Sequence, residues 1–404
     1  SQVSEKLRGQ AGTDVRLTLE RDGKQFEKTI KRQEIQLPNV SYYSMLDNHT
    51  GYIKLDEFTK DAGKNVLEAY KKLKAEGADK LVLDLRGNGG GLLNEAVNIV
   101  NIFVDKGQTV VSKKAKNVEK SVTFKTTQKA FDANVPLVVL IDAYSASASE
   151  IVAGSLQDLD RAVVVGQRSF GKGLVQTVIP LIYNTQMKVT ESKYYIPSGR
   201  CIQAIDYANR DENGRATKIP DSLKTAFKTK NGRTVYAGSG IEPDVYIEPV
   251  YASNIAISLI GKSICFNYAT EFVKKHPTIA PAKEFEFTDQ MYEDFVDFIK
   301  DKDYSYTTAS EKTIEDLLTT AETDKVNCQT IEEIKRSKER LIADKKNDIY
   351  KFKDEIKELL KSEIVSRYYY QKGRTEVALK NDTELDRAVE ILNNTKEYKK
   401  ILSK

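Results

Sequence analysis

Histidine is the scarcest chemically versatile residue in this chain of 404 residues, since only His49 and His276 are present. Any Ser-His-Asp, Cys-His or multi-histidine metal mechanism would have to use one of these two. His49 lies in the polar turn 47–50, and His276 follows a basic pair and precedes a proline. Both are expected at the surface, so a catalyst built on this sequence is expected to use another residue type as its general base.

Cysteines and long apolar runs are also scarce. The three cysteines lie far apart without C-x-x-C spacing, which predicts neither a zinc site nor a disulfide framework. The sequence has no run of 18 apolar residues, which a membrane-spanning helix would need. The chain also opens without the apolar core of a signal peptide. Lys and Arg number 63 against 59 Asp and Glu, so the net charge of +4 does not favour nucleic-acid binding. We expect no metal and no cofactor.

The strand and helix patterns divide the sequence into three parts. Residues 1–36 predict a short helix and two strands joined at the turn dipeptide Asp22-Gly23. Residues 37–251 alternate buried strands with helices, which predicts an α/β core with a mainly parallel sheet. Residues 252–404 are poor in glycine and carry apolar residues at helical spacing, which predicts a helical C-terminal domain. The spacing slips between seven and eight residues, so we favour helical packing over a coiled coil.

A glycine-rich turn follows the buried strand predicted at 80–85. Four of the five residues 87–91 are glycine, and the sequence lacks the P-loop and dinucleotide-binding patterns. The plain interpretation is a tight turn. The alternative is an oxyanion hole, because backbone N–H groups without neighbouring side chains can stabilise a developing negative charge.

Two further turns carry residues suited to nucleophilic chemistry. The serine-rich segment 143–150 follows the apolar strand 136–141 and opens a helix, which is typical of a nucleophile elbow but also of an ordinary helix cap. Lys172 stands between two glycines after another buried strand. A desolvated lysine can act as general base toward a serine, whereas most lysines are solvated surface residues.

Five motifs in sequence order carry a resemblance to a known family. They are D-L-R-x-N-x-G-G at 84–91, S-A-S-A-S-E at 145–150, F-G-K-G at 170–173, P-S-G-R at 197–200 and G-I-x-P-D at 240–244. Between about Gly51 and Asp244 the chain resembles the C-terminal processing (tail-specific) serine peptidases. The resemblance implies a Clp-protease/crotonase-like protease core, which agrees with the alternating strands and helices.

The resemblance also assigns roles in the site. It implies Ser147 as nucleophile and Lys172 as general base, with Gln176 orienting the lysine. A fully extended strand would hold the Cα atoms of Lys172 and Gln176 roughly 13 Å apart, so we expect a bend near Gly173. The oxyanion is expected to be bound by the N–H of Ala148 and that of Gly90 or Gly91. Asp158 is expected to give structural support, and Arg86 to brace the glycine loop.

What the family implies about the whole protein is broader. Residues 1–36 resemble the last part of a PDZ domain, 37–251 the protease core, and 252–404 lie outside the resemblance. A polypeptide substrate recognised near its C-terminus is implied, with a homo-oligomer and a regulatory or adaptor protein as further partners, and no nucleic acid. Family members are usually exported, so we expect a periplasmic or membrane-associated extracytoplasmic location, although this chain shows no export signal.

Two other functions stay open from sequence. The first is a catalytically silent peptide-binding scaffold of the same fold, against which the intact Ser147 and Lys172 argue. The second is a crotonase-like acyl-CoA enzyme, which would need acidic catalytic residues at the oxyanion loops. No such pair is evident in the three turns.

Overall fold

A computed structural model describes residues 2–21, 23–35, 37–47, 49–183 and 185–403. The chain divides into two compact units, residues 1–39 and 40–404, and each is described by itself. Within the described ranges, none of the helices has the length and apolar character that a membrane crossing needs.

The first unit is a helix followed by a β-hairpin. Its elements are α1 (Gln2–Leu7), β1 (Asp14–Arg21) and β2 (Lys24–Lys31), with Asp14 paired to Lys31. The turn predicted at Asp22-Gly23 includes Asp22, which lies outside the described residues. Arg32 ties the unit together by donating to the carbonyl of Leu7 at 2.8 Å. None of the described residues up to position 35 is buried. The relation of this unit to a PDZ domain stays a prediction.

The second unit is built on a six-stranded sheet in the order β16-β9-β8-β5-β4-β3. All neighbouring strands are parallel except β3, which pairs antiparallel with β4. The strands are β3 (Val40–Met45), β4 (Thr50–Leu55), β5 (Lys80–Asp84), β8 (Leu137–Ile141), β9 (Val163–Gly166) and β16 (Val245–Tyr246). This confirms the predicted α/β core.

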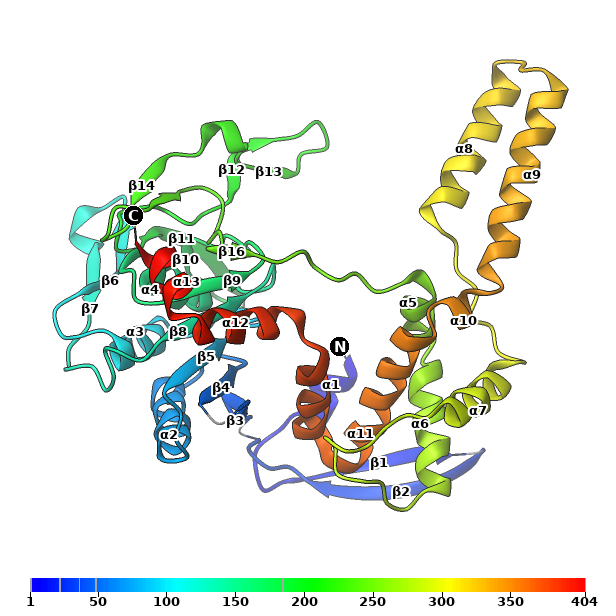
Figure 1. The fold of residues 1–404 in the computed structure, drawn as a ribbon, viewed down its shortest axis with the longest axis horizontal. Coiled ribbons are helices and arrows are strands. Elements are labelled where there is room, and N and C mark those ends of the chain that lie inside the picture. Colours follow the sequence, from blue (N-terminus) through cyan, green and yellow to red (C-terminus); the bar gives the residue numbers. More distant parts are fainter. Residues whose placement is uncertain (1, 22, 36, 48, 184, 404) are drawn as a thin grey trace. The chain divides into compact units, whose positions relative to one another are not determined.

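Helices cover both faces of this sheet (Figure 1). One face packs against α2 (Ala62–Ala75), α3 (Leu93–Phe103) and α4 (Ala148–Asp158). The other face packs against α12 (Thr383–Asn393) and α13 (Thr395–Leu402). Side chains alternate between the two cores along each strand, as the period of two requires: Leu81 and Leu83 belong to the first core and Val82 to the second.

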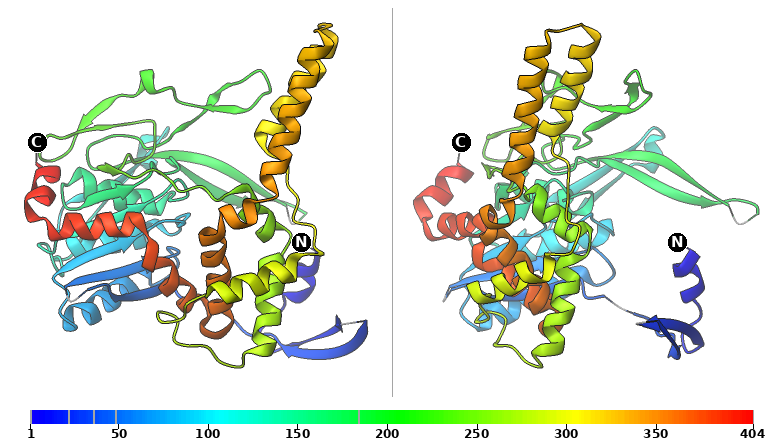
Figure 2. Two further views of the ribbon diagram at one scale, coloured as in Figure 1. Left: turned by 45° about the vertical axis from the view of Figure 1, so that its right-hand side comes forward. Right: turned by 90° about the vertical axis from the view of Figure 1, so that its right-hand side faces the viewer.

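A second, antiparallel sheet lies beside the core in the order β10-β11-β6-β7. Its strands are β6 (Thr109–Ala115), β7 (Val122–Lys125), β10 (Leu174–Pro180) and β11 (Gln186–Tyr195), with the short 3-10 helix η1 (Val118–Lys120) between β6 and β7. Figure 2 shows β10 and β11 as a long hairpin. The polar segment that follows forms β12 (Ile205–Arg210) with β13 (Ala216–Lys218), η2 (Asp221–Leu223), and β14 (Ala226–Lys228) with β15 (Thr234–Tyr236).

The region after residue 252 is helical, as predicted, and has its own apolar core. Its helices are α5 (Asn254–Gly261), α6 (Ile264–Lys275), α7 (Asp289–Ile299), α8 (Ala309–Thr323), α9 (Cys328–Lys345), α10 (Asp348–Lys351), α11 (Lys353–Ala378) and η3 (Leu379–Asn381). Figure 1 shows α8 and α9 as an antiparallel hairpin. The sequence predicted a single helical domain at 252–404. In the structure α12 and α13 are not part of this apolar core and pack on the six-stranded sheet instead.

Candidate active site

The glycine loop between β5 and α3 is fixed by one asparagine. Asn88 is buried, donates to the carbonyl of Leu55 at 2.8 Å and accepts the N–H of Gly90 at 2.8 Å. Gly90 has φ +98°, and a Cβ there would lie 2.6 Å from the carbonyl oxygen of Ala146 and 2.8 Å from the Cβ of Ser147. Only glycine therefore fits, and its backbone lies directly against the serine turn.

The serine turn has the geometry of a nucleophile elbow. Ser147 stands between β8 and α4 with φ 57° and ψ −111°, a conformation rarely adopted by residues other than glycine. Such strain costs about 1–3 kcal/mol and persists only where neighbours hold it. Here Ala146 donates its N–H, and Ser149 its hydroxyl, to the carbonyl of Asn88. The elbow and the glycine loop thus hold each other in place.

Ser145 has a structural role. Its hydroxyl donates to the carbonyl of Leu85 at 2.8 Å, and its carbonyl accepts the N–H of Phe170 at 3.0 Å. Ser145 is fully buried, whereas Ser147 is half-buried. The middle serine is therefore the one that solvent and a substrate can reach.

Glu150 joins the serine turn to the lysine loop. Its carboxylate is buried and accepts the N–H groups of Ser147 and Lys172, both at 2.8 Å, on one oxygen. The other oxygen accepts the N–H of Gly171 and the hydroxyl of Ser169, both at 2.6 Å. Burial raises the pKa of Glu150, while these four donors favour the ionised form.

This role of Glu150 was not assigned from the sequence. The signal was the spacing Ser-x-x-Glu at a helix start, which is the pattern of a capping box. The pattern predicts the bond from the serine N–H to Glu150. It does not reveal that the same carboxylate also holds a loop more than twenty residues further along the chain.

Within the described residues, the side chains of the expected catalytic group are not hydrogen-bonded to one another. The Lys172 side chain is exposed, and within the described residues no hydrogen bond joins its amine to the Ser147 hydroxyl. The phenol of Tyr194 contacts the Ser147 side chain instead; burial raises the pKa of Tyr194, and this contact lowers it. Gln176 is exposed on β10 and donates to the hydroxyl of Thr190 at 3.4 Å. The Ser147, Lys172 and Gln176 group stays a prediction.

The chain does not run as one straight strand from Lys172 to Gln176. Strand β10 begins only at Leu174, and its pairing register with β11 shifts between Val175 and Gln176. Gly173 lies before the strand and donates its N–H to the Gln203 side chain at 2.8 Å. The lysine loop is thereby fixed through its backbone.

The expected oxyanion donors are brought together but differ in their present partners. A Cβ on Gly90 would lie 2.8 Å from the nitrogen of Ala148, so the two backbones adjoin. The N–H of Gly90 is bonded to Asn88. Gly91 is held against Phe58, with a bridge between the two backbones. Ala148 is the first residue of α4, where backbone N–H groups have no acceptor within the helix.

Two parts of the chain match known protein families. Residues 49–209, which include four of the five motifs, match the family described as "Peptidase family S41". This part of the chain is therefore similar to peptidase family S41. Residues 255–392 match a second family, "Probable PDZ-protease, C-terminal helical domain".

Curated relatives are similar to this chain over about half its length. The "Carboxy-terminal-processing protease" of Bartonella bacilliformis is 39% identical over 211 residues, covering 51% of this chain and 48% of the relative. The "Probable CtpA-like serine protease" of Staphylococcus aureus strain N315 is 38% identical over 202 residues, covering 50% and 40%. The chain thus spans less than half the length of these relatives.

A solved structure, that of the photosystem II D1 C-terminal processing protease, is 27% identical and covers 61% of this chain and 59% of its own. Its TM-score against this chain is 0.42.

Two polar networks brace the α/β core outside the elbow. Asp158, at the end of α4, forms a fully buried ion pair with Arg200 at 2.9 Å and accepts the N–H of Ser198 at 2.9 Å. Burial raises the pKa of Asp158, while the Arg200 charge lowers it. Asp158 therefore holds the P-S-G-R turn, which is the structural support that the sequence suggested.

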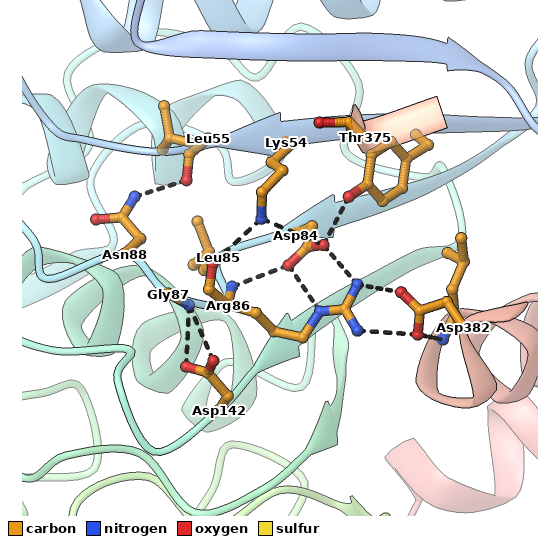
Figure 3. A network of polar contacts seen from close by, with 12 residues as sticks. Lys54, Leu55, Asp84, Leu85, Arg86, Gly87, Asn88, Asp142, Thr375 and Asp382 are labelled. Atoms are coloured by element: carbon orange, nitrogen blue, oxygen red, sulfur yellow. Dashed lines mark hydrogen bonds and ion pairs between the residues drawn. The ribbon is translucent and has the colours of Figure 1, made fainter. Parts of the chain in front are cut away.

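Arg86 occupies the second network, at the base of the glycine loop (Figure 3). Its N–H and Nε donate to one oxygen of Asp84 at 2.9 and 3.0 Å, and Nη2 donates to the other at 2.7 Å. Burial alone would raise the pKa of Asp84, but the charges of Arg86 and Lys54 lower it to about 2. Arg86 thus braces the loop from within the protein.

The scarce histidines lie apart from this chemistry. Both are exposed, as predicted: His49 faces Asp79, and the His276 ring stacks on Phe272 in the helical region. Across the described ranges, no three His, Cys, Asp or Glu side chains gather in a way that could hold a metal ion.

Proposed function

We propose that this chain is the proteolytic part of a serine endopeptidase that hydrolyses peptide bonds through an acyl-enzyme on Ser147. The observation that carries the proposal is the strained elbow of Ser147, which lies against the glycine loop and is tied by Glu150 to the backbone of Lys172. A turn that costs energy to hold is typical of a functional position. The match of residues 49–209 to peptidase family S41 supports the same reaction.

The proposed reaction transfers the acyl group in two steps. Neutral Lys172 takes the proton of the Ser147 hydroxyl as its oxygen attacks the substrate carbonyl. The N–H of Ala148, with Gly90 or Gly91, binds the resulting oxyanion. Collapse expels the amine, which takes the proton from the Lys172 ammonium. Water then attacks the ester with Lys172 as base, releasing the acid and restoring Ser147.

The proposal requires the Lys172 side chain to turn from its exposed position toward Ser147. The loop backbone is already anchored by Glu150 and Gln203, so the movement is confined to the four-carbon side chain. Ser147 must also exchange its contact with Tyr194 for one with the amine. Catalytic hydrogen bonds commonly form only when substrate binds, and Gln176 is proposed to orient the amine in that state.

For the whole protein we propose a polypeptide substrate that is recognised near its C-terminus. The name of the Bartonella relative, a carboxy-terminal-processing protease, supports this choice. We further propose an extracytoplasmic location, a regulatory or adaptor protein, and self-association as a homo-oligomer. These follow from the family resemblance alone.

A peptide-binding scaffold without turnover is the second candidate. The observation that favours it is the exposed Lys172 side chain, which lacks a hydrogen bond to Ser147 in the described part of the chain. A scaffold could retain the fold and the elbow without a functioning base. The two candidates differ in whether Ser147 reacts.

The deciding experiment measures cleavage of an unfolded polypeptide with a free C-terminus, together with labelling of Ser147 by a fluorophosphonate. We expect the full chain to cleave and to be labelled, and Ser147→Ala and Lys172→Ala each to lose cleavage. Lys188→Ala is the matched control, since Lys188 is an exposed lysine on the neighbouring strand β11. Unlabelled wild-type protein that cleaves nothing would favour the scaffold.

A further inference from the structure

The end of the chain contacts the base of the glycine loop, almost 300 residues away in sequence. Asp382, the N-cap of α12, accepts from Nη1 and Nη2 of Arg86 at 2.9 and 2.6 Å. Glu384, in the first turn of α12, accepts from Nη1 at 2.6 Å. This two-pronged geometry is the strong form of an arginine–carboxylate pair.

Arg86 is therefore shared between two segments of the chain. Its backbone N–H, Nε and Nη2 donate to Asp84 at the end of β5, while Nη1 and Nη2 also donate to the carboxylates of α12 (Figure 3). The side chains of Arg86, Asp382 and Glu384 are 17%, 14% and 15% exposed, so water competes little for these bonds. Burial would lower the pKa of Arg86, but the charges of Asp84 and Asp382 raise it.

The same network reaches both loops of the candidate site. Gly87, the residue after Arg86, donates its N–H to the carboxylate of Asp142 at 3.0 Å. Asp142 in turn accepts the N–H of Ser145, within the serine turn. Gln167, just after β9, donates to Glu384. The loops that follow β5, β8 and β9 are thus all linked to α12 by short chains of hydrogen bonds.

We propose that Asp382 and Glu384 are positioning residues for the glycine loop, so that seating of α12 on Arg86 sets the oxyanion-binding geometry beside Ser147. The proposal rests on the proposed function for its catalytic consequence. Without the two carboxylates, Nη1 of Arg86 loses its partners on α12 and Nη2 keeps only Asp84, so the guanidinium is held by Asp84 alone. The segment from Gly87 to Gly91 then loses the tie between its base and α12.

The first test measures kcat and KM for an unfolded polypeptide in the full chain. Asp382→Asn keeps the ability to cap α12, because asparagine is as good an N-cap as aspartate. Glu384→Gln keeps the side-chain shape. We expect the double variant to lose about 10-fold or more in kcat with KM within about threefold, as displaced catalytic groups do. Glu384→Asp, which keeps the charge, is expected to retain most of kcat.

Glu390→Gln is the matched control. Glu390 lies on the same helix, is 66% exposed and pairs with Arg387 at 3.0 Å rather than with Arg86. The substitution removes the same charge from α12, so it separates a loss of the Arg86 contact from a general change in helix charge. We expect its kcat to match that of the wild type.

The second test does not depend on activity. Hydrogen exchange measured by mass spectrometry is expected to speed up in peptides covering residues 85–92 of the double variant, while peptides from β4 and α2 stay protected. That result supports the proposal even if no substrate is cleaved, in which case the proposed function alone fails. Unchanged exchange in 85–92, or faster exchange across the whole sheet, would overturn the proposal. So would an unchanged kcat in an active enzyme.

Discussion

Replacing Glu150 by glutamine tests the contact that joins the two halves of the candidate site. The carboxylate accepts four hydrogen bonds, from the backbones of Ser147, Gly171 and Lys172 and from the hydroxyl of Ser169. A carboxamide has one oxygen and one NH2 group, so it cannot accept from both sides. The least costly orientation keeps its oxygen toward Ser147 and Lys172 and turns its NH2 toward Gly171.

The magnitude follows from the donor left without a partner. The hydroxyl of Ser169 can rotate to accept from the new NH2, but the N–H of Gly171 cannot. One buried backbone donor without an acceptor costs about 1–3 kcal/mol. Glu150→Ala would orphan three such donors, about 3–9 kcal/mol, which approaches the whole stability of about 5–15 kcal/mol of a folded domain. Glutamine is therefore the informative substitution.

The expected result is a folded but slow enzyme. Movement of the lysine loop by about 1 Å relative to Ser147 is expected to lower kcat by about 10²-fold, measured on an unfolded polypeptide, with a lower Tm. Glu95→Gln is the control, because Glu95 also accepts a backbone N–H, that of Gly63 at 2.8 Å, away from the site. A Glu150→Gln variant with wild-type kcat and Tm would refute the reasoning.

Three further predictions concern the supports around the elbow. Gly90→Ala places a Cβ 2.6 Å from the carbonyl oxygen of Ala146 and is expected to lower kcat, whereas at Gly89 an added Cβ meets no atom within 4 Å and kcat should change little. Asp158→Asn breaks a buried ion pair and should lower the unfolding free energy by about 3–5 kcal/mol in urea titrations; a loss below about 1 kcal/mol would contradict the buried role. The pKa of Asp84 falls from 3.8 to about 2 on folding. The ionised Asp84 therefore adds to the free energy of unfolding above pH 3.8, and this addition is lost as the pH falls through about 2. The stability gap between wild type and Asp84→Asn should narrow with acidification, and a constant gap would speak against it.

The meeting of the three loops could be predicted from the sequence. The glycine turn, the serine turn and the lysine loop each follow a buried parallel strand, namely β5, β8 and β9. Since the carboxyl ends of parallel strands lie at one edge of a sheet, loops in these places converge there. The strained backbone of Ser147 is also what a serine between a strand and a helix suggests.

The side-chain geometry could not be predicted in the same way. A lysine between two glycines has a backbone fixed by its neighbours, yet its four-carbon side chain has many rotamers of similar energy. In the structure that side chain is exposed. The role of Glu150 escaped for a different reason. Its contact with Ser147 is local and follows a pattern, but its contact with Lys172 depends on where β9 ends in space.

The strand order explains why α12 packs on one face of the six-stranded sheet. From β4 through β5, β8 and β9 to β16 the chain advances across the sheet in one direction. Because crossovers between parallel strands are right-handed, an advance in one direction puts every crossover helix on the same face. The helices α2, α3 and α4 obey this rule and share one core.

The opposite face is then left with fully apolar, buried side chains and no crossover helix. These are Val82, Val138, Leu140, Val163 and Val165. At about 1.5–3 kcal/mol each, their exposure would cost roughly 7–15 kcal/mol, comparable to the net stability of a domain. A parallel sheet of this kind requires a cover from elsewhere in the chain. The helix that provides it also brings Asp382 and Glu384 to Arg86, so the demand for a closed core is what connects the C-terminal segment to the candidate site.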